Sequence, residues 1–310
     1  MKLAYIISAY KYPEQLVRLV RRIHAPGACI VIHVDRNTAA TVYDAMTRGV
    51  ADLDGVHFLP RHRCFWGDFG HVWASLKGIH YLLRTNRPFD YVALLTGQDY
   101  PTHARHIREG VLRECTGDEF IEGKPLPYAT WPEGGLTRVE KWHFNLLGRR
   151  FSFPENRPFR NPLLGMLWRF LVRCAPDKRK MPLGHRPHGG GSYWCLSRDC
   201  VEYIDRFVDE HPGYVRFFRT VHVPDELFFQ TLVMNSPYRE RVRQEGIHLV
   251  NWNTHSPHPE ILTSDDFDRI AATRHLFARK FDATIDSAVL DRIDGLIERE
   301  EQEHSRISSG

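Results

Sequence analysis

The segment CIVIHVD, Cys29–Asp35, is a run of apolar, mostly β-branched residues that ends on an acid. LAYIISA (3–9) and FDYVALLTGQDYP (89–101) are further apolar runs of strand length, before and after it. EQLVRLVRRIH (14–24) and VWASLKGIHYLLR (72–84), which lie between these runs, repeat apolar residues at helical spacing. Strands that are apolar throughout and alternate with helices are typical of parallel sheets covered on both faces. The sequence therefore predicts an α/β fold with a mostly parallel central sheet flanked by helices.

Two of these strands run into acidic residues. Asp35 follows IVIHV, and Asp99 follows VALLTGQ. Ligands of open α/β sheets bind beyond the carboxyl ends of the strands. We therefore expect a nucleotide-sized pocket near Asp35 and Asp99.

Composition and charge narrow the class of protein. The chain has 310 residues, 42% of them hydrophobic and 26% charged, which is ordinary for a soluble globular protein. Its 42 basic and 38 acidic residues give a net charge of +4, too mild to predict a nucleic-acid partner. That balance still leaves room for a local basic pocket that binds an anionic ligand.

The six cysteines are scattered and form no C-x-x-C pair, which argues against a zinc knuckle. Several lie in apolar runs, as buried free thiols do, so a reducing cytoplasm is the simplest compartment. The N-terminal segment lacks the features of a signal peptide, and no stretch approaches the ~20 apolar residues that span a bilayer. We expect a cytoplasmic protein that is at most peripheral to the inner membrane.

The amino-acid composition changes near Glu122, where prolines, aromatic residues and basic residues become frequent. This predicts long ordered loops and short helices, and such loops often form lids or acceptor surfaces. Periodicity returns with SYWCLSRDCVEYIDRFVDEH (192–211), and the tail HSRISSG (304–310) is expected to fray. We expect one domain, 1–310, in three parts: 1–121, a loop-rich insertion at 122–190, and 191–303. The family resemblance given below implies nucleotide-sugar binding for the first part, and catalysis and diphosphate binding for the third.

The segment VPDELFFQT, Val223–Thr231, sets two acids directly after a proline. Pro224 suits the first turn of a helix, and acids there offset the partial positive charge of the helix N-terminus. The alternative is that one of the acids, Asp225 or Glu226, is a catalytic base. On the residues alone, the helix-start interpretation is favoured.

Phosphate- and metal-binding motifs are scarce in this chain. It contains no P-loop and no dinucleotide fingerprint, and GGGS (189–192) is read as a turn or as a close backbone approach to a ligand. The Asp-x-Asp pattern occurs as DLD (52–54) and DFD (266–268), and we interpret both as structural. The histidine pairs, three residues apart at 103/106 and 185/188, lack the H-E-x-x-H context.

Diphosphate that is held without a metal needs arginine and lysine. HLFARKFD supplies Arg279 and Lys280 between apolar residues, with a solvated surface as the alternative. Trp66, in WGDFG, is either a core tryptophan or a flat surface beside a base or a sugar ring.

Seven segments together resemble one family, the core-2/I-branching β-1,6-N-acetylglucosaminyltransferases and peptide O-xylosyltransferases. They occur in the family's order: IHVD, WGDF, LLTGQDYP, GGSYWCLSRDCVEYI, VPDELFFQTLVMNSP, NWNTHSPHP and FARKFD. The resemblance implies a GT-A-like nucleotide-binding fold and inverting transfer from UDP-sugars without a metal-binding Asp-x-Asp motif. It therefore implies no metal site and no cofactor other than the UDP-sugar co-substrate.

The resemblance also implies roles for individual residues. Asp35 matches the acid that contacts the nucleoside, and Trp66 matches the tryptophan of the donor site. Arg279 and Lys280 match the basic pair that holds the diphosphate in place of a metal. Glu226 matches the catalytic base, which takes the proton of the acceptor hydroxyl during in-line attack on the anomeric carbon.

The glycine-rich loop is expected to add Ser192 to the donor site. For the acceptor, we name five candidates from this loop and from segments expected nearby: Asp99, Tyr193, Trp194, Arg138 and Lys141. Tyr193 stands where some relatives, notably xylosyltransferases, carry an acid.

The paired secretory cysteines and the membrane anchor of the animal enzymes have no counterpart here, so we expect a bacterial, cytoplasmic member. A bacterial surface polysaccharide, a lipopolysaccharide precursor or a secondary metabolite is then a more plausible acceptor than mucin or proteoglycan.

The sequence thus predicts a metal-independent, inverting glycosyltransferase. UDP-N-acetylglucosamine is the first donor candidate and UDP-xylose the second, and peripheral contact with a membrane is compatible with both. One alternative is a nucleotide-sugar- or carbohydrate-binding protein without catalysis. Another is a metal-dependent hydrolase that uses the histidines.

Overall fold

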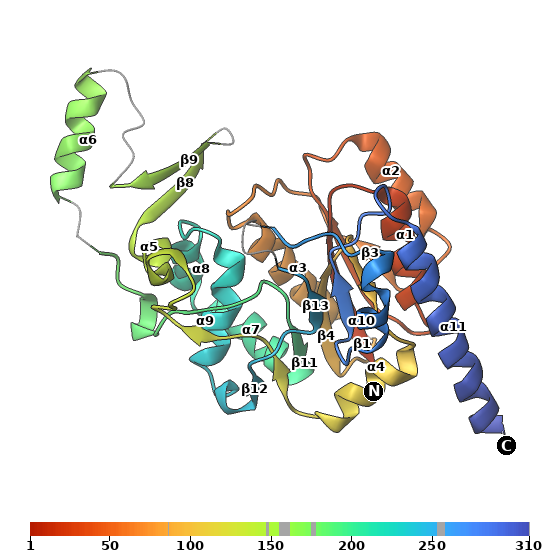
Figure 1. Cartoon of the computed structure of the whole chain (residues 1–310). Helices are drawn as coiled ribbons and strands as arrows, with labels where there is room; N and C mark the ends of the chain where they lie inside the picture. The colour runs from red at the N-terminus through yellow and green to blue at the C-terminus, as the bar shows by residue number, and fades with distance from the viewer. Residues whose placement is uncertain (86, 147–148, 155–161, 175–177, 253–257, 310) are drawn as a thin grey trace.

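A seven-stranded sheet forms the centre of the molecule in the computed structural model (Figure 1). The structure describes residues 1–85, 87–146, 149–154, 162–174, 178–252 and 258–309. The strands run in the order β12-β6-β11-β4-β1-β2-β3, and β11 is antiparallel to both of its neighbours while the other pairs are parallel. The strand bounds are β1 Leu3–Ala9, β2 Ile30–Val34, β3 Val56–Phe58, β4 Tyr91–Thr96, β6 Glu119–Phe120, β11 Cys195–Ser197 and β12 Val242–Arg243.

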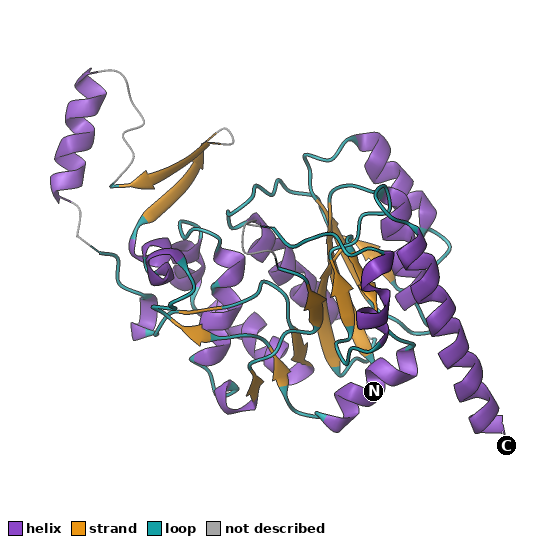
Figure 2. Ribbon diagram, viewed as in Figure 1, coloured by secondary structure: helices purple, strands orange, loops and turns teal. Residues whose placement is uncertain are grey.

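The apolar strands are buried on both faces, because successive side chains point to opposite sides of the sheet. Ile7 belongs to the hydrophobic cluster on one face, and its neighbour Ile6 belongs to the cluster on the other. Figure 2 shows helices on both sides of the sheet. The first face is covered by α1 Pro13–Ile23, α2 Ala40–Gly49 and α11 Ala288–Ser309, and the second by α3 Gly70–Arg84, α7 Arg198–Glu210, α8 Pro212–Phe218 and α9 Phe228–Met234.

A smaller sheet adjoins the carboxyl end of β4. It has the order β13-β14-β5, and its antiparallel β14–β5 register places Arg279 opposite Asp99. Two residues that are far apart in the sequence are thereby fixed side by side. The bounds of these strands and of the nearby helices are β5 Asp99–Pro101, β13 His248–Val250, β14 Phe277–Arg279, α4 Arg105–Glu114 and α10 Phe267–Ala271, with short 3₁₀ turns at Arg239–Arg241 and Ser264–Asp266.

The predicted α/β class with a mostly parallel sheet is confirmed, as are the helices expected over 14–24 and 72–84. The expectation of a frayed tail is wrong for the described residues, because α11 continues to Ser309. The division at residues 121 and 190 stays a prediction. Within the described parts of the chain, no helix is both long enough and apolar enough to cross a membrane.

The segment expected to be loop-rich holds more regular structure than predicted. A hairpin, β8 Trp142–Leu146 paired with β9 Arg149–Phe153, precedes the 13-residue helix α6 Pro162–Cys174. We call β8, β9 and α6 the arm, and Figure 1 shows it projecting from the rest of the molecule at the upper left. Around it lie β7 Lys124–Pro125, β10 His188–Gly189, α5 Thr137–Glu140 and short 3₁₀ turns at Pro132–Gly135 and Pro182–Gly184.

Arg179 fastens the base of the arm to the main body. Its guanidinium donates to the backbone oxygens of Lys141 at 2.9 Å, Thr220 at 3.1 Å and Phe217 at 2.9 Å. The guanidinium also stacks on the Phe217 ring, with 3.9 Å to the ring centroid. These contacts fix where the arm leaves the body, next to the site described below.

Candidate active site

A cavity of about 570 Å³ lies beyond the carboxyl ends of β1, β2 and β4, where the strand pattern predicts a ligand. Its lining brings together Asp35, Trp66, Glu226, Arg279 and Lys280. These residues come from distant parts of the sequence, and the parallel sheet gathers them at one edge. A carboxylate and a basic pair therefore share one cavity.

Arg279 forms the buried end of the basic group. Its side chain is 12% exposed and lies 3.2 Å from the Asp99 carboxylate. The guanidinium stacks on the Tyr193 ring, 4.0 Å from the centroid. Burial raises the pKa of Tyr193 to about 12, so the phenol stays neutral beside the guanidinium. Tyr193 thus lines the cavity as the surface against which Arg279 packs.

The prediction that Asp99 contacts an acceptor is wrong, because its side chain is fully buried. Its carboxylate accepts hydrogen bonds from the Thr96 N–H at 2.6 Å and from His248 Nε2 at 3.1 Å. Burial opposes ionisation of Asp99, but the charge of Arg279 and the contact with His248 outweigh it and lower the pKa. Asp99 is therefore the buried counter-charge of Arg279.

Two lysines extend the basic group toward the solvent side of the cavity. Burial and the nearby charges of Lys11 and Arg279 lower the pKa of Lys280. Lys11 also lines the cavity, and its ammonium donates to the Tyr12 hydroxyl at 2.9 Å. That hydroxyl in turn donates to Asp282 at 2.6 Å. Among its described lining residues, the cavity thus holds three lysine and arginine side chains, of which sequence reasoning named Arg279 and Lys280 and missed Lys11.

Glu226 lies in the same cavity and is held by an arginine from α5. Arg138 Nη1 donates to Glu226 Oε2 at 2.6 Å, and the guanidinium stacks on Trp131 with 4.0 Å to the ring centroid. Burial raises the pKa of Glu226 above its usual value, although the charge of Arg138 acts in the opposite direction. A carboxylate with a raised pKa accepts a proton more readily than an ordinary glutamate, which suits a general base.

The geometry of the PDE segment argues against the helix-cap interpretation. Pro224–Glu226 is a separate 3₁₀ turn, and α9 begins only at Phe228. Among the described residues, no side chain forms a capping hydrogen bond at the start of either element. Asp225 instead accepts from Ser192 Oγ at 2.9 Å, which ties the turn to the glycine-rich loop. Ser192 lies in the cavity lining, as expected for a donor-site residue, while its role there stays a prediction.

The glycines before Ser192 are explained by close packing. A Cβ at Gly190 would lie 2.3 Å from the Glu122 backbone oxygen, and one at Gly189 would lie 2.5 Å from the Trp131 ring. The Gly190 N–H also donates to the Glu226 backbone oxygen at 3.0 Å. The loop therefore needs glycine in order to sit against Glu122 and Trp131.

Asp35 and Trp66 also line the cavity. The Asp35 carboxylate accepts from the backbone N–H groups of Asn37 at 2.9 Å and Cys64 at 3.1 Å. Trp66 is 67% exposed, so the interpretation as a core tryptophan is wrong. Its ring and that of His222 meet in a T-shaped arrangement, with 5.6 Å between centroids.

Besides Asp99, three acceptor candidates lie outside this cavity as the described residues form it. Trp194 is fully buried in the core and packs against Phe229 with 5.1 Å between ring centroids, so the predicted acceptor contact is wrong. Arg138 contacts Glu226, as described above. Lys141 ends α5, and its backbone oxygen accepts from Arg179. Acceptor contacts of Arg138 and Lys141 stay predictions.

Three carboxylates of the two Asp-x-Asp segments make contacts within the protein, which fits the structural interpretation, and that interpretation stays a prediction. Asp52 pairs with Arg21 at 2.7 Å, and Asp54 pairs with Arg87 at 2.7 Å. In the second segment, Asp266 completes a capping box with the side chain and backbone of Thr263. Each of these three carboxylates already has a structural partner.

One group among the described residues has the composition of a metal site. His33, His62 and Cys64 place one potential ligand atom each within 4.8 Å of one another. Burial lowers the pKa of His33 to about 3 and raises that of the Cys64 thiol to about 12. His33 Nε2 already accepts from the His62 N–H at 3.2 Å. Metal binding would have to displace this bond and the thiol proton.

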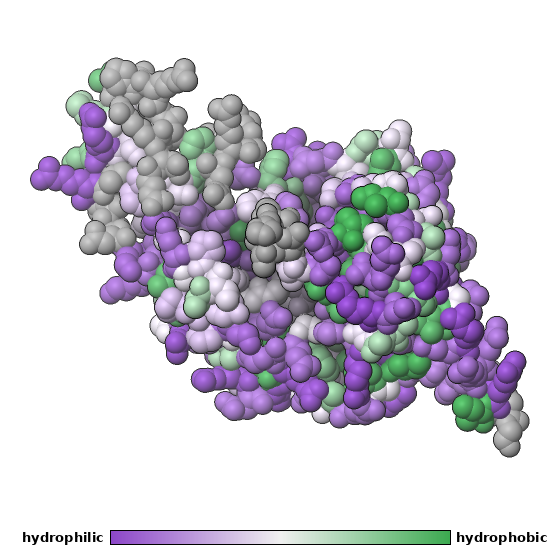
Figure 3. Space-filling model, viewed as in Figure 1, coloured by the Kyte–Doolittle hydropathy of each residue, from purple (hydrophilic) through white to green (hydrophobic). Residues whose placement is uncertain are grey.

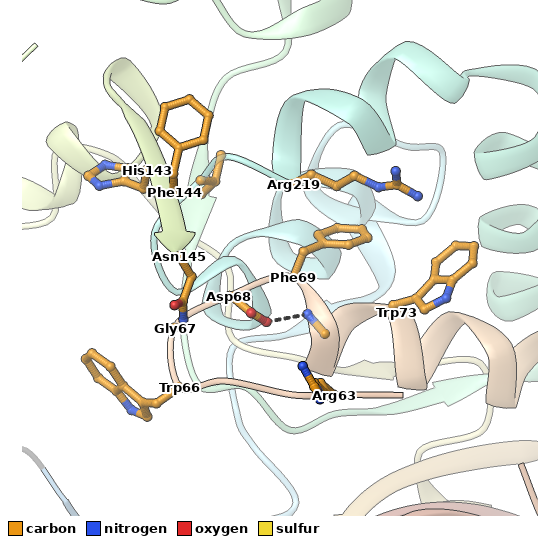
Figure 4. A pocket seen from close by; sticks show the side chains of 12 residues that line it. Arg63, Trp66, Gly67, Asp68, Phe69, Trp73, His143, Phe144, Asn145 and Arg219 are labelled. Atoms are coloured by element: carbon orange, nitrogen blue, oxygen red, sulfur yellow. Dashed lines mark hydrogen bonds between the residues drawn. The ribbon is translucent and has the colours of Figure 1, made fainter. Parts of the chain in front are cut away.

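A second, more open cavity of about 420 Å³ adjoins the first, and Trp66 and Gly67 line both. Figure 4 shows Phe144 and Asn145 of the arm on one side of it and Trp73 of α3 and Arg219 across from them. Asp68, in the loop between, accepts from the Gly70 N–H at 2.7 Å. The sequence does not predict this cavity, because nothing in the sequence indicates that the arm lies close to α3 and α8.

Comparison with known proteins identifies the family of this chain. The family model "Core-2/I-Branching enzyme" matches residues 3–121 and 169–271, which include Asp35, Trp66 and Glu226 but end before Arg279. Xylosyltransferase 2 of Rattus norvegicus is 24% identical over 315 residues, covering 95% of this chain and 33% of that protein. Beta-glucuronosyltransferase GlcAT14B of Arabidopsis thaliana is 26% identical over 314 residues, covering 94% of this chain and 65% of that protein.

The chain thus spans about a third of the length of the rat relative. Among solved structures, mouse xyloside xylosyltransferase 1 in its apo form matches with a TM-score of 0.38 and 9% identity. That match covers 89% of this chain and 97% of the mouse chain, and a similarity of this size supports no further argument. The family model, by contrast, matches well over half of the residues. The chain belongs to the Core-2/I-branching enzyme family.

Proposed function

We propose that this protein is an inverting glycosyltransferase that moves a sugar from a UDP-sugar to a hydroxyl group of a glycan or another acceptor, without a metal. The observation that carries the proposal is the shared cavity of Glu226, Arg279 and Lys280. Membership of the Core-2/I-branching family and the glycosyltransferase names of the relatives support it.

The proposed reaction needs one base and one cationic site. Glu226 takes the proton of the acceptor hydroxyl as its oxygen bonds to the anomeric carbon. The bond from that carbon to the β-phosphate oxygen breaks, and the electron pair leaves with UDP. Arg279, Lys280 and Lys11 stabilise the negative charge that develops on the diphosphate, so the leaving group needs no proton.

The donor is proposed from the chemistry of the cavity and from the relatives. Asp35 accepts hydrogen bonds from ribose or base, and Trp66 covers a flat face of the ligand. UDP-N-acetylglucosamine and UDP-xylose remain our donor candidates, and the name of the Arabidopsis thaliana relative adds UDP-glucuronate. A cytoplasmic location, with acceptors from bacterial polysaccharide or glycoconjugate synthesis and peripheral membrane contact, remains part of the proposal.

The acceptor is proposed to enter through the second cavity and to reach Glu226 across Trp66 and Gly67. Trp73 and Phe144 offer apolar surface for a sugar face. Arg63 and Arg219 are exposed. The Arg219 guanidinium lies over the Trp73 ring, 5.9 Å from its centroid, and neither arginine forms an ion pair among the described residues. Two such guanidinium groups favour an acceptor that carries a carboxylate or a phosphate.

The experiment that tests the function is a screen of UDP-sugars by thermal shift, with EDTA present, followed by transfer assays with the donor that stabilises best. A ligand that binds only the folded state raises the unfolding midpoint, and at equal ligand concentration a tighter ligand raises it more. We expect one UDP-sugar to stabilise the protein and to be consumed in the transfer assay. Without an acceptor, the same UDP-sugar should be hydrolysed slowly. Stabilisation with neither hydrolysis nor transfer would instead favour a binding protein without catalysis.

A further inference from the structure

The arm carries an apolar surface that faces away from the body. Leu163, Met166, Leu167 and Phe170 of α6 are 71%, 59%, 54% and 63% exposed. Their spacing of i, i+3, i+4 and i+7 puts them on one face of the helix. Figure 3 shows green apolar atoms beside purple hydrophilic ones on the projecting arm. A large apolar stripe of this kind on a surface marks an interaction site.

The opposite face of α6 is occupied by the rest of the arm. The ring of Trp168 meets Phe153 of β9 edge-on, with 4.8 Å between centroids and an interplanar angle of 88°. Phe153 in turn packs against Trp142 of β8, with 5.7 Å between centroids. The aromatic contacts of Trp168 therefore fix the orientation of α6, and the apolar stripe lies on the face that points away from β8 and β9.

The charge of this region is strongly positive. Residues 149–180 hold nine Lys and Arg residues against two Asp and Glu residues, whereas the rest of the chain holds 33 basic and 36 acidic residues. Arg169 and Arg173 are exposed and lie three residues after Met166 and Phe170, so they flank the apolar stripe. Apolar residues flanked by arginines are typical of helices that lie in the interface of an anionic membrane.

We propose that α6 docks in the plane of a bilayer rich in anionic phospholipid. Its four apolar side chains would enter the boundary between headgroups and acyl chains, and Arg169 and Arg173 would contact the lipid phosphates. At about 1.5 Å per residue, the 13-residue helix is about 20 Å long, which suits lying on a membrane and not crossing it. Charge complementarity selects this partner over a second copy of the chain, whose corresponding surface would carry the same positive charge.

Docking would also place the proposed acceptor entrance near the membrane. Phe144, which lines the second cavity, belongs to the same arm and is 47% exposed. An acceptor that is anchored in the bilayer would then enter between the arm and the body. This consequence rests on the proposed function, whereas the docking itself does not.

The test is co-flotation of the full chain with vesicles, either of phosphatidylcholine alone or of phosphatidylcholine with phosphatidylglycerol, at low and high salt. We expect binding to the anionic vesicles and loss of binding at high salt. Arg169→Gln with Arg173→Gln should lower the partition coefficient by about fivefold for each charge removed. Leu167→Gln with Phe170→Gln should lower it more, because apolar insertion is removed.

Matched variants keep the test specific. Ile285→Gln with Ile307→Gln removes apolar side chains that are 64% and 79% exposed elsewhere, and should leave flotation unchanged. Thermal unfolding midpoints check that each variant is folded without reference to UDP. Equal flotation with both vesicle types, or none with either, would overturn the proposal. The proposal would also be overturned if sedimentation showed that the protein is a dimer without lipid and that the Leu167→Gln, Phe170→Gln double variant is a monomer.

Discussion

Asp99→Asn probes the buried pair that positions Arg279. The substitution keeps the volume and leaves a side-chain oxygen that can accept from the Thr96 N–H, but it removes the negative charge. Asp99 is fully buried, and Arg279 is 12% exposed. Removing one partner of a buried ion pair leaves the other charge uncompensated, and this costs about 3–5 kcal/mol of unfolding free energy.

The assay is urea unfolding followed by tryptophan fluorescence at neutral pH. Asp52→Asn is the matched control, because it removes one partner of the exposed pair with Arg21, whose side chains are 46% and 60% exposed. Exposed pairs contribute about 0–1 kcal/mol. In a double-mutant cycle, Arg279→Met should recover part of the loss in the Asp99→Asn background, since no buried charge then remains unpaired.

The pH dependence gives an independent check of the same pair. The pKa of Asp99 is lowered below its ordinary value of 3.8, so its stabilising contribution is present above that value. The contribution is lost as the pH falls through the folded-state pKa. Asp99→Asn should therefore flatten the acid side of the stability profile. A loss no larger than that of Asp52→Asn, with an unchanged acid profile, would refute the reasoning.

Three further predictions concern the cavity. Arg138→Gln removes the charge that lowers the pKa of Glu226, so the acid limb of the pH profile of kcat/KM should move to higher pH. An acid limb at the same pH as in the wild type would show that Arg138 does not influence the base. Lys280→Ala should lose one charge-assisted contact of about 1.5–3 kcal/mol with UDP, and calorimetry that gives wild-type affinity would contradict its role. Sugar transfer should survive dialysis against a chelator. If the active protein instead contains stoichiometric zinc, and the Cys64→Ser variant does not, a metal is assigned to His33, His62 and Cys64.

The sheet and the position of the cavity follow from the sequence because they depend on local signals. The continuous apolar runs of β1, β2 and β4 predict buried parallel strands, and their carboxyl ends predict where Asp35 lies. The same reasoning places Lys11 at this edge, because it follows β1 by two residues, although it belongs to none of the seven family segments. The alternation of side chains along an extended segment would also have separated Tyr193, which faces the cavity, from Trp194, which faces the core.

The burial of Asp99 depends on pairing that no local pattern contains. It belongs to β5, whose partner β14 lies nearly 180 residues later, and only that register sets Asp99 opposite Arg279. The arm was missed for another reason. The spacing of apolar residues in α6 is helical, but the surrounding prolines and arginines gave the whole segment the composition of a loop.

The most direct measurement of the central claim is a comparison of turnover and UDP affinity for Glu226→Gln on one preparation. Glu202→Gln, on the exposed face of α7, is the control for glutamate replacement. The glutamine keeps the shape of the side chain but cannot take a proton at neutral pH. We predict a fall in kcat of about 10²–10⁴-fold with UDP binding retained. Turnover equal to that of the wild type, with UDP still bound, would contradict the assignment of Glu226 as the base.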